Sequence, residues 1–306
     1  MSSPVDYLRR YASIVDDVEA FLEAARSPLP RVIWANPLAA DPLDVGERIK
    51  GYCPAAVPLS WHAGGWRLPT DSNPGYWVEH VVGAIHVQEE ASMLAGQLVG
   101  AQPGERVLDM CAAPGGKTVQ MAVAMQDQGT LVAMDRSMPR VAALRRTLER
   151  LGITCAVVHQ VNAVRQTVPT DDKLFDRVLV DGPCTCEGTT RKNLGRRKST
   201  DPGYRDTIVQ IQKSLLRKAM RLVRPGGTVV YSTCTYAPEE NEAVLDALPH
   251  GAAAIEPIEL PQGLQVSPGV VEWEGRTYRP DVAHAIRLWP HQNNTGGFFV
   301  ARIRRL

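Results

Sequence analysis

Residues 104–118, Gly-Glu-Arg-Val-Leu-Asp-Met-Cys-Ala-Ala-Pro-Gly-Gly-Lys-Thr, constrain the fold of this chain more than any other segment. A short apolar run ends there in a small loop that contains glycine, and a second apolar segment follows at 119–125. Pro114 disfavours a helix interior, whereas Gly115 and Gly116 tolerate positive φ and let a ligand approach the backbone closely. The segment therefore predicts a strand, a tight turn and the start of a helix, with a ligand against bare backbone amides.

A nucleoside-containing cofactor fits this loop best. A second apolar run, 129–134, ends in Asp135, close to the spacing at which an acid after the second strand binds ribose hydroxyls. The G-x-G-x-x-G pattern of nicotinamide cofactors is absent, and Cys111 stands where an ATP-binding P-loop needs its first glycine. These mismatches leave S-adenosylmethionine, which has no phosphates and needs only a short loop and a ribose acid.

Strand-like and helix-like segments alternate through the main domain. Apolar spacing predicts strands at 155–159, 175–181 and 228–232 and helices around 141–151 and 208–222. Such alternation indicates an α/β fold with a doubly wound, Rossmann-like sheet, whose ligand lies at the carboxyl ends of the strands.

A small α+β module is predicted at residues 1–75, ahead of the main domain at 76–306. The turn-rich stretch 70–75 marks the expected boundary. The predicted elements of the module are a helix over 4–26, a strand at 31–34, a helix at 42–50 and a strand at 65–68. The first helix is predicted from an apolar stripe formed by Tyr7, Tyr11, Ile14, Val18 and Leu22.

Composition restricts the location and the partners of the chain. No apolar stretch reaches the roughly 18 residues of a membrane span, and the N-terminus lacks a signal-peptide core, so we expect a cytoplasmic protein without a membrane partner. The formal net charge is only +1, so contacts with a polyanion must be local. Residues 191–198 carry five positive charges and no acid, which fits either a solvated loop or a phosphate contact.

Two cysteines follow predicted strands at the edge where the ligand is expected. Cys184 lies in the segment 181–186 after one strand, and Cys234 follows another. Cys184 and Cys186 could form a metal pair, but no second Cys/His pair at ligand spacing accompanies them, so we expect no metal. Two thiols beside a methyl donor suit methylation of cytosine C5, because a thiolate that adds to C6 makes C5 nucleophilic and a second group can assist release.

Three motifs carry a family resemblance: 107–118, 181–184, and 231–235 followed by Glu-Glu-Asn-Glu at 239–242. They resemble the motifs of RNA cytosine-5 methyltransferases of the NOP/SUN (RsmB/RsmF-like) family. The similarity extends to 87–92 upstream and to 287–291 and 297–301 downstream. Residues 187–192 and 79–80 are most similar to a bacterial 16S ribosomal RNA branch.

The resemblance implies a class I methyltransferase fold, S-adenosylmethionine as cofactor and structured RNA as partner, with ribosomal RNA favoured and transfer RNA as the alternative. A monomer is expected. The resemblance makes Cys234 the nucleophile and Cys184 the thiol that assists release, and it places Asp181 and Lys117 at the reacting centre. The implied cofactor contacts are Cys111, Ala112, Ala113, Pro114, Gly115, Gly116, Lys117, Asp135, Arg140, Asn162, Asp181 and Pro183.

The chain departs from the family pattern at three places. Asn162 replaces a usual acid, Thr185-Cys186 replaces Ser-Gly, and no further RNA-binding domain follows Leu306. Target recognition is therefore expected from residues 1–75 and 191–198.

Two rival functions differ in chemistry. A DNA cytosine-5 methyltransferase would use the Pro-Cys cysteine as nucleophile, but it would need a large target-recognition insert that this sequence lacks. A ribosome-assembly factor could bind RNA without turnover, although Cys184, Cys234, Asp135 and Asp181 are all intact.

Overall fold

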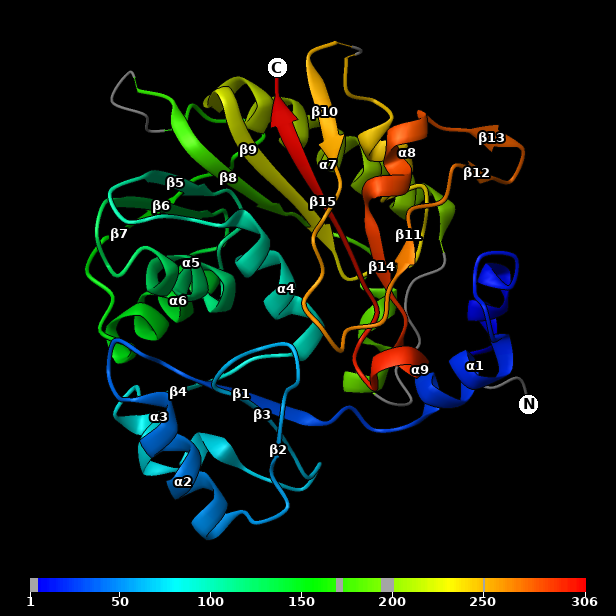
Figure 1. Cartoon of the computed structure of the whole chain (residues 1–306). Coiled ribbons are helices and arrows are strands. Elements are labelled where there is room, and N and C mark those ends of the chain that lie inside the picture. The colour runs from blue at the N-terminus through cyan, green and yellow to red at the C-terminus, as the bar shows by residue number, and fades with distance from the viewer. Residues whose placement is uncertain (1–4, 169–172, 194–200, 250) are drawn as a thin grey trace. The chain divides into compact units, whose positions relative to one another are not determined.

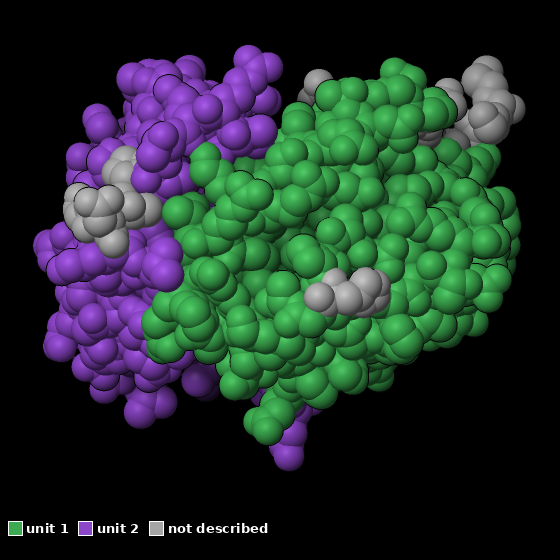
Figure 2. Space-filling model, turned by 90° about the horizontal axis from the view of Figure 1, so that it is seen from above, with its two compact units in different colours: residues 1–29, 180–259, 265–306 green, residues 30–179, 260–264 purple. Residues whose placement is uncertain are grey.

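The computed structural model describes residues 5–168, 173–193, 201–249 and 251–306 (Figure 1). The chain divides into two compact units, drawn in different colours in Figure 2. Unit 1 comprises residues 1–29, 180–259 and 265–306, and unit 2 comprises 30–179 and 260–264. Residue 75 lies within unit 2, and a separate module at 1–75 stays a prediction.

Unit 2 begins with a four-stranded antiparallel sheet in the order β2-β3-β1-β4. Its core includes Ile33, Ile49, Trp66 and Ile85. The predicted strand–helix–strand order is confirmed. The elements are β1 (Arg31–Ala35), α2 (Pro42–Tyr52), β2 (Val57–Pro58), β3 (Gly65–Leu68), η2 (Pro74–Tyr76), α3 (Val78–Val81) and β4 (Ile85–Val87).

The second part of unit 2 is a parallel sheet of strands alternating with helices, in the order β8-β5-β6-β7. The elements are α4 (Glu90–Val99), β5 (Arg106–Asp109), α5 (Gly116–Ala124), β6 (Thr130–Asp135), α6 (Met138–Arg150), β7 (Ala156–Gln160) and β8 (Phe175–Asp181). Helix α6 buries Val141, Leu144 and Leu148, the apolar positions that predicted it. The predicted α/β fold with parallel strands is confirmed.

Unit 1 contains antiparallel strands in which β15 pairs with β9, β10 and β14. The strands are β9 (Val223–Thr233), β10 (Ala253–Glu256), β11 (Ser267–Pro268), β12 (Glu272–Trp273), β13 (Arg276–Thr277), β14 (Ile286–Leu288) and β15 (Phe298–Arg305). The helices are η1 (Asp6–Tyr11), α1 (Val18–Arg26), η3 (Glu187–Asn193), α7 (Pro202–Leu222), α8 (Glu242–Leu245), η4 (Pro280–His284) and α9 (Pro290–Asn293).

The single helix predicted over residues 4–26 is wrong in its middle, because the chain forms two short helices there. The first, η1, ends at Tyr11, and α1 begins at Val18. Asp17 causes the second start, since its side chain accepts a hydrogen bond of 2.9 Å from the amide of Ala20 and so caps α1. Tyr11 and Leu22 of the predicted apolar stripe are nevertheless buried.

No described helix has the length and apolar character that crossing a membrane would require.

Candidate active site

The glycine loop of unit 2 connects β5 to α5 as the sequence predicts. Asp109 at the end of β5 accepts hydrogen bonds from the amide of Cys111 at 3.3 Å and from the hydroxyl of Thr118 at 2.8 Å, which turns the chain into the loop. Gly115 has φ of 114°, and a Cβ there would lie 3.0 Å from Leu144, so this position requires glycine. The N-cap residue of α5 is Gly115, which has no side chain to cap the first turn of the helix, so the N-terminus of α5 suits a ligand.

The predicted ribose acid, Asp135, ends β6 and is 3% exposed. Its Oδ1 accepts a hydrogen bond of 2.9 Å from the amide of Ser137. Its Oδ2 lies 3.3 Å from Nη1 of Arg140, an ion-pair distance, but accepts no hydrogen bond from any residue of the described ranges. Arg140 also donates a hydrogen bond to the carbonyl of Ala113, so it links the acid to the glycine loop. A buried carboxylate oxygen without a donor is costly, and a ligand hydroxyl would satisfy it.

A cavity of about 610 Å³ follows β6 and β7 in the same unit, large enough for a nucleoside. Its lining residues are Arg136, Ser137, Gln160, Asn162 and Gln166. Oδ1 of Asn162 accepts hydrogen bonds from the amides of Val164 and Arg165, which leaves its Nδ2 for a ligand. The structure therefore brings Asn162 to a cavity, as a neutral donor rather than the acid usual in the resembling family.

The other predicted cofactor residues fall in two groups. Residues 111–117 all belong to unit 2, and Lys117 is the second residue of α5. Asp181 and Pro183 belong to unit 1, where Asp181 accepts a hydrogen bond of 2.8 Å from Ser232 and the carbonyl of Pro183 accepts one of 2.9 Å from Gln212.

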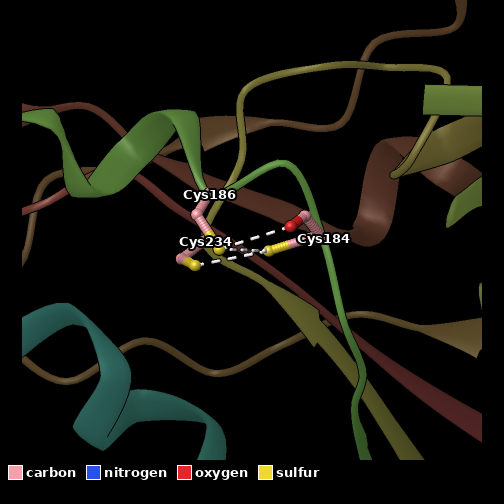
Figure 3. A group of neighbouring side chains, drawn as sticks. All are labelled: Cys184, Cys186 and Cys234. Carbon is pink, nitrogen blue, oxygen red and sulfur yellow. Dashed lines mark hydrogen bonds between the residues drawn. The ribbon is translucent and has the colours of Figure 1, made fainter. Parts of the chain in front are cut away.

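Three thiols converge in unit 1 (Figure 3). Cys184 follows β8, and Cys234 comes directly after β9. Their Sγ atoms lie 3.3 Å apart, and the Sγ of Cys186 lies 3.6 Å from that of Cys184. Cys184 is buried, whereas Cys234 and Cys186 are partly exposed. The two thiols that the sequence singled out are therefore neighbours, and a third accompanies them.

A buried carboxylate holds the two cysteine-bearing loops. Glu240 is fully buried and accepts hydrogen bonds from the amide and the hydroxyl of Thr185, at 2.9 and 2.5 Å. The hydroxyls of Thr185 and Thr235 lie 2.9 Å apart, and Gln212 donates to Glu240 at 3.1 Å. Because Thr185 follows Cys184 and Thr235 follows Cys234, this network fixes the two thiols relative to each other.

Sequence reasoning missed a second buried carboxylate next to these loops, that of Glu187. Tyr11 donates a hydrogen bond to Glu187, and Nη2 of Arg205 lies 3.2 Å from the same carboxylate. The hydroxyl of Thr235 donates to it at 3.4 Å. Tyr11 was expected only in an apolar stripe, and Glu187 stood in a motif without an assigned role, so no sequence pattern connected them.

The pKa values of Cys184 and Cys234 are both raised above the usual range of a thiol. The hydrogen bond with Cys186, the hydrogen bond with Cys234 and burial raise the pKa of Cys184 well above its usual range. The hydrogen bond with Cys184 lowers the pKa of Cys234, but the interaction with Cys186 and burial outweigh it, so this pKa is also raised. A thiol attacks as the thiolate, so a nucleophilic role for either cysteine would require its deprotonation.

Arg191, the first residue of the basic stretch 191–198, does not serve as a phosphate contact. Its side chain is buried, and its guanidinium donates to the carbonyls of Ser27, Pro28 and Thr295 and to Oδ1 of Asn294. It thus ties η3 to two other segments of unit 1. Residues 194–200, which include Arg196, Arg197 and Lys198, lie outside the described residues.

Comparison with known proteins gives consistent matches. Residues 97–304 match the family described as 16S rRNA methyltransferase RsmB/F. A tRNA (cytosine(49)-C(5))-methyltransferase of Pyrococcus abyssi is 35% identical over 97% of this chain and 95% of that protein. A ribosomal RNA small subunit methyltransferase F of Erwinia tasmaniensis is 31% identical over 99% of this chain, which spans 63% of that protein's length.

The fold agrees with these matches. A crystal structure of a methyltransferase homologue from Pyrococcus horikoshii superposes with a TM-score of 0.85 at 29% identity, covering 97% of this chain and 93% of that one. The length of the family match and the identity to the archaeal relative show that the chain belongs to the RsmB/F family of RNA methyltransferases.

Proposed function

We propose that this chain is an S-adenosylmethionine-dependent RNA (cytosine-5) methyltransferase that works through a covalent bond between Cys234 and C6 of the target cytosine. The observation that carries the proposal is the pair of thiols at the ends of β8 and β9, with sulfur atoms 3.3 Å apart. Methyl transfer to oxygen or to an exocyclic nitrogen needs no such pair, whereas cytosine C5 is not nucleophilic until a thiolate has added to C6.

The residues of unit 2 support S-adenosylmethionine as the methyl donor. Asp135 offers a buried oxygen that lacks a hydrogen-bond donor among the described residues, which suits a ribose hydroxyl. The amides of the loop 111–117 and the side chains of Arg140 and Asn162 complete the proposed binding set. When bound, S-adenosylmethionine would supply an electrophilic methyl group on its sulfonium.

The two thiols have separate tasks in this proposal. Cys234 loses its proton and forms the C–S bond to C6, which makes C5 an enamine carbon. After C5 has been methylated, its proton must leave and the C6–S bond must break. We assign assistance of this release to Cys184, with Asp181 and Lys117 in supporting roles at the reacting base. The partly exposed Cys234 suits the attacking role better than the buried Cys184.

Structured RNA is the proposed substrate, methylated in the cytoplasm by a monomeric enzyme. The family description favours ribosomal RNA of the small subunit. Transfer RNA is the second candidate, because the relative matched over 95% of its own length carries a transfer RNA name.

Single substitutions of the two thiols test the mechanism, because attack precedes methyl transfer and release follows it. Cys234→Ala should form neither product nor adduct, with a loss of several orders of magnitude in rate. Cys184→Ala should accumulate a protein–RNA adduct that survives denaturing electrophoresis. Cys53→Ala in unit 2 serves as the control and should behave as wild type.

The opposite pattern would contradict this assignment. If the adduct accumulates in Cys234→Ala and is abolished in Cys184→Ala, the nucleophile is Cys184, as in the DNA enzymes. If the wild-type protein binds RNA and S-adenosylmethionine but transfers no methyl group to any cytosine, the chain is a binding factor and the enzymatic proposal is wrong.

A further inference from the structure

The proposed reaction leaves Cys186 without a task. Its Sγ lies 3.6 Å from that of Cys184 and donates a hydrogen bond of 3.3 Å to the Cys184 carbonyl. The sulfur atoms of Cys184, Cys186 and Cys234 all lie within 4.8 Å of one another. Within the described ranges, no other group of three cysteine, histidine or acidic side chains is arranged in this way.

The spacing of the sulfurs matches a thiolate metal site. Zinc binds cysteine sulfur at about 2.3 Å in tetrahedral geometry, which separates neighbouring sulfurs by about 3.8 Å. Two of the observed separations, 3.3 and 3.6 Å, lie slightly below this value, and the third pair lies within 4.8 Å, so small shifts of the side chains would give the tetrahedral spacing. We propose that Cys184, Cys186 and Cys234 bind one Zn²⁺ ion, which inactivates the enzyme by occupying both catalytic thiols.

The sequence expectation of no metal rested on the lack of a second ligand pair beside Cys184 and Cys186. The fold supplies the third ligand instead from Cys234, which is 50 residues from Cys184 in the chain. Soft thiolate ligands favour Zn²⁺ over Mg²⁺ or Ca²⁺. Three protein ligands leave one tetrahedral position for water. Each thiol releases its proton to solvent on binding, so the site forms more readily as pH rises.

The donor set is preorganised. Glu240 binds Thr185, which lies between Cys184 and Cys186, and the Thr185 hydroxyl contacts that of Thr235. Ligands whose loops are already fixed lose little freedom when an ion binds. Cys186 itself has φ of 58°, a conformation that favours glycine over cysteine. The chain thus keeps a thiol at a position where its backbone alone would favour glycine.

Zinc binding by the three thiols does not depend on the proposed function, whereas the inhibition rests on it. The two parts therefore need separate measurements. Binding is measured by calorimetry with Zn²⁺ on the full, reduced protein without RNA or cofactor. Binding of Co²⁺, followed by its thiolate charge-transfer absorption, reports the ligand type. Inhibition is measured as methyl transfer with and without Zn²⁺, followed by addition of a chelator.

Cys186→Gly is the informative variant, because glycine suits the backbone there and both catalytic thiols remain. We expect one Zn²⁺ per wild-type chain, a loss of affinity of about 100-fold or more in Cys186→Gly, and methyl transfer by the variant that resists zinc. Cys53→Ala should bind zinc as wild type does. A chelator should restore the activity of zinc-treated wild-type protein.

Several results would overturn the inference. These are no zinc binding by the reduced protein, equal affinity in Cys186→Gly, or activity restored only by a thiol reductant, which would point to a disulfide instead. If zinc binds as expected but neither protein transfers methyl groups, the zinc site stands and the proposed function fails.

Discussion

At the scale of single residues, Asp135 offers the sharpest test of the cofactor proposal. Its Oδ2 is buried and accepts no hydrogen bond within the described ranges, so a ribose hydroxyl would gain a charge-assisted bond there. Asp135→Ala should weaken S-adenosylmethionine binding by about 10- to 100-fold, which corresponds to about 1.5–3 kcal/mol. Titration calorimetry with the cofactor measures this loss.

Asp127→Ala is a useful comparison for that experiment. Asp127 is an acid of the same unit whose oxygens are already used by the amides of Thr154 and Cys155. We expect Asp127→Ala to lower stability but not cofactor affinity. Unaltered cofactor affinity in Asp135→Ala would refute the assignment of Asp135 to the ribose, and RNA affinity should be unchanged in both variants.

The residues that carry family motifs could be located from sequence, but their partners could not. Cys184 and Cys234 were identified because each follows a predicted strand, and the structure brings their sulfurs together. Glu240 stood in a motif with no role, and its contact with Thr185 spans 55 residues of sequence. A single hydrogen bond between distant residues leaves no periodic pattern in the sequence, so only the folded chain reveals it.

At the scale of elements, the loops after β8 and β9 depend on Glu240. Glu240→Gln keeps the shape of the side chain but replaces one acceptor oxygen by an NH2 group. That NH2 group must then face the donors of Thr185 or the side-chain amide of Gln212, which hydrogen-bond to Glu240 in the wild type. We expect a loss of about 1–3 kcal/mol of unfolding free energy. Because the two thiols would no longer be held at a fixed position relative to each other, kcat should fall about 10-fold with little change in KM.

Glu239→Gln is the matched control for this substitution. Glu239 is the neighbouring residue, and it forms a partly exposed ion pair of 2.6 Å with Arg10. The pair does not involve Thr185 or Thr235, so stability should fall by only about 1 kcal/mol or less and kcat should change little. If Glu240→Gln behaves like Glu239→Gln in both measurements, the carboxylate does not position the thiols.

Periodic elements were predictable because their apolar faces repeat. Helix α6 was located in this way, whereas the strands β5 to β8 of the parallel sheet were located as short apolar runs. Strand β15 was not predicted as a strand, because its residues 298–301 were used only for the family resemblance; the structure buries all four. The break between η1 and α1 was also missed, because a single capping residue, Asp17, ends an otherwise continuous helical spacing.

At the scale of the whole molecule, the net charge indicates how the protein would bind RNA but not which RNA it would bind. A net charge of +1 provides no long-range attraction, so binding must rely on local contacts and shape. One expected contact, Arg191, is instead buried among Ser27, Pro28 and Asn294. The fold and the family could therefore be predicted from motifs, whereas the RNA surface could not.

The RNA target is testable in cells, because 5-methylcytosine resists bisulfite conversion. The family description favours small-subunit ribosomal RNA, so deleting the gene should remove one methylated cytosine from that RNA and leave transfer RNA unchanged. In the proposed mechanism the thiol of Cys234 must reach C6, so the cytosine should lie in a loop or another unstacked segment. Restoring the wild-type gene should restore the mark, and restoring Cys234→Ala should not. Loss of a mark from transfer RNA alone would instead assign the chain the activity named for its archaeal relative.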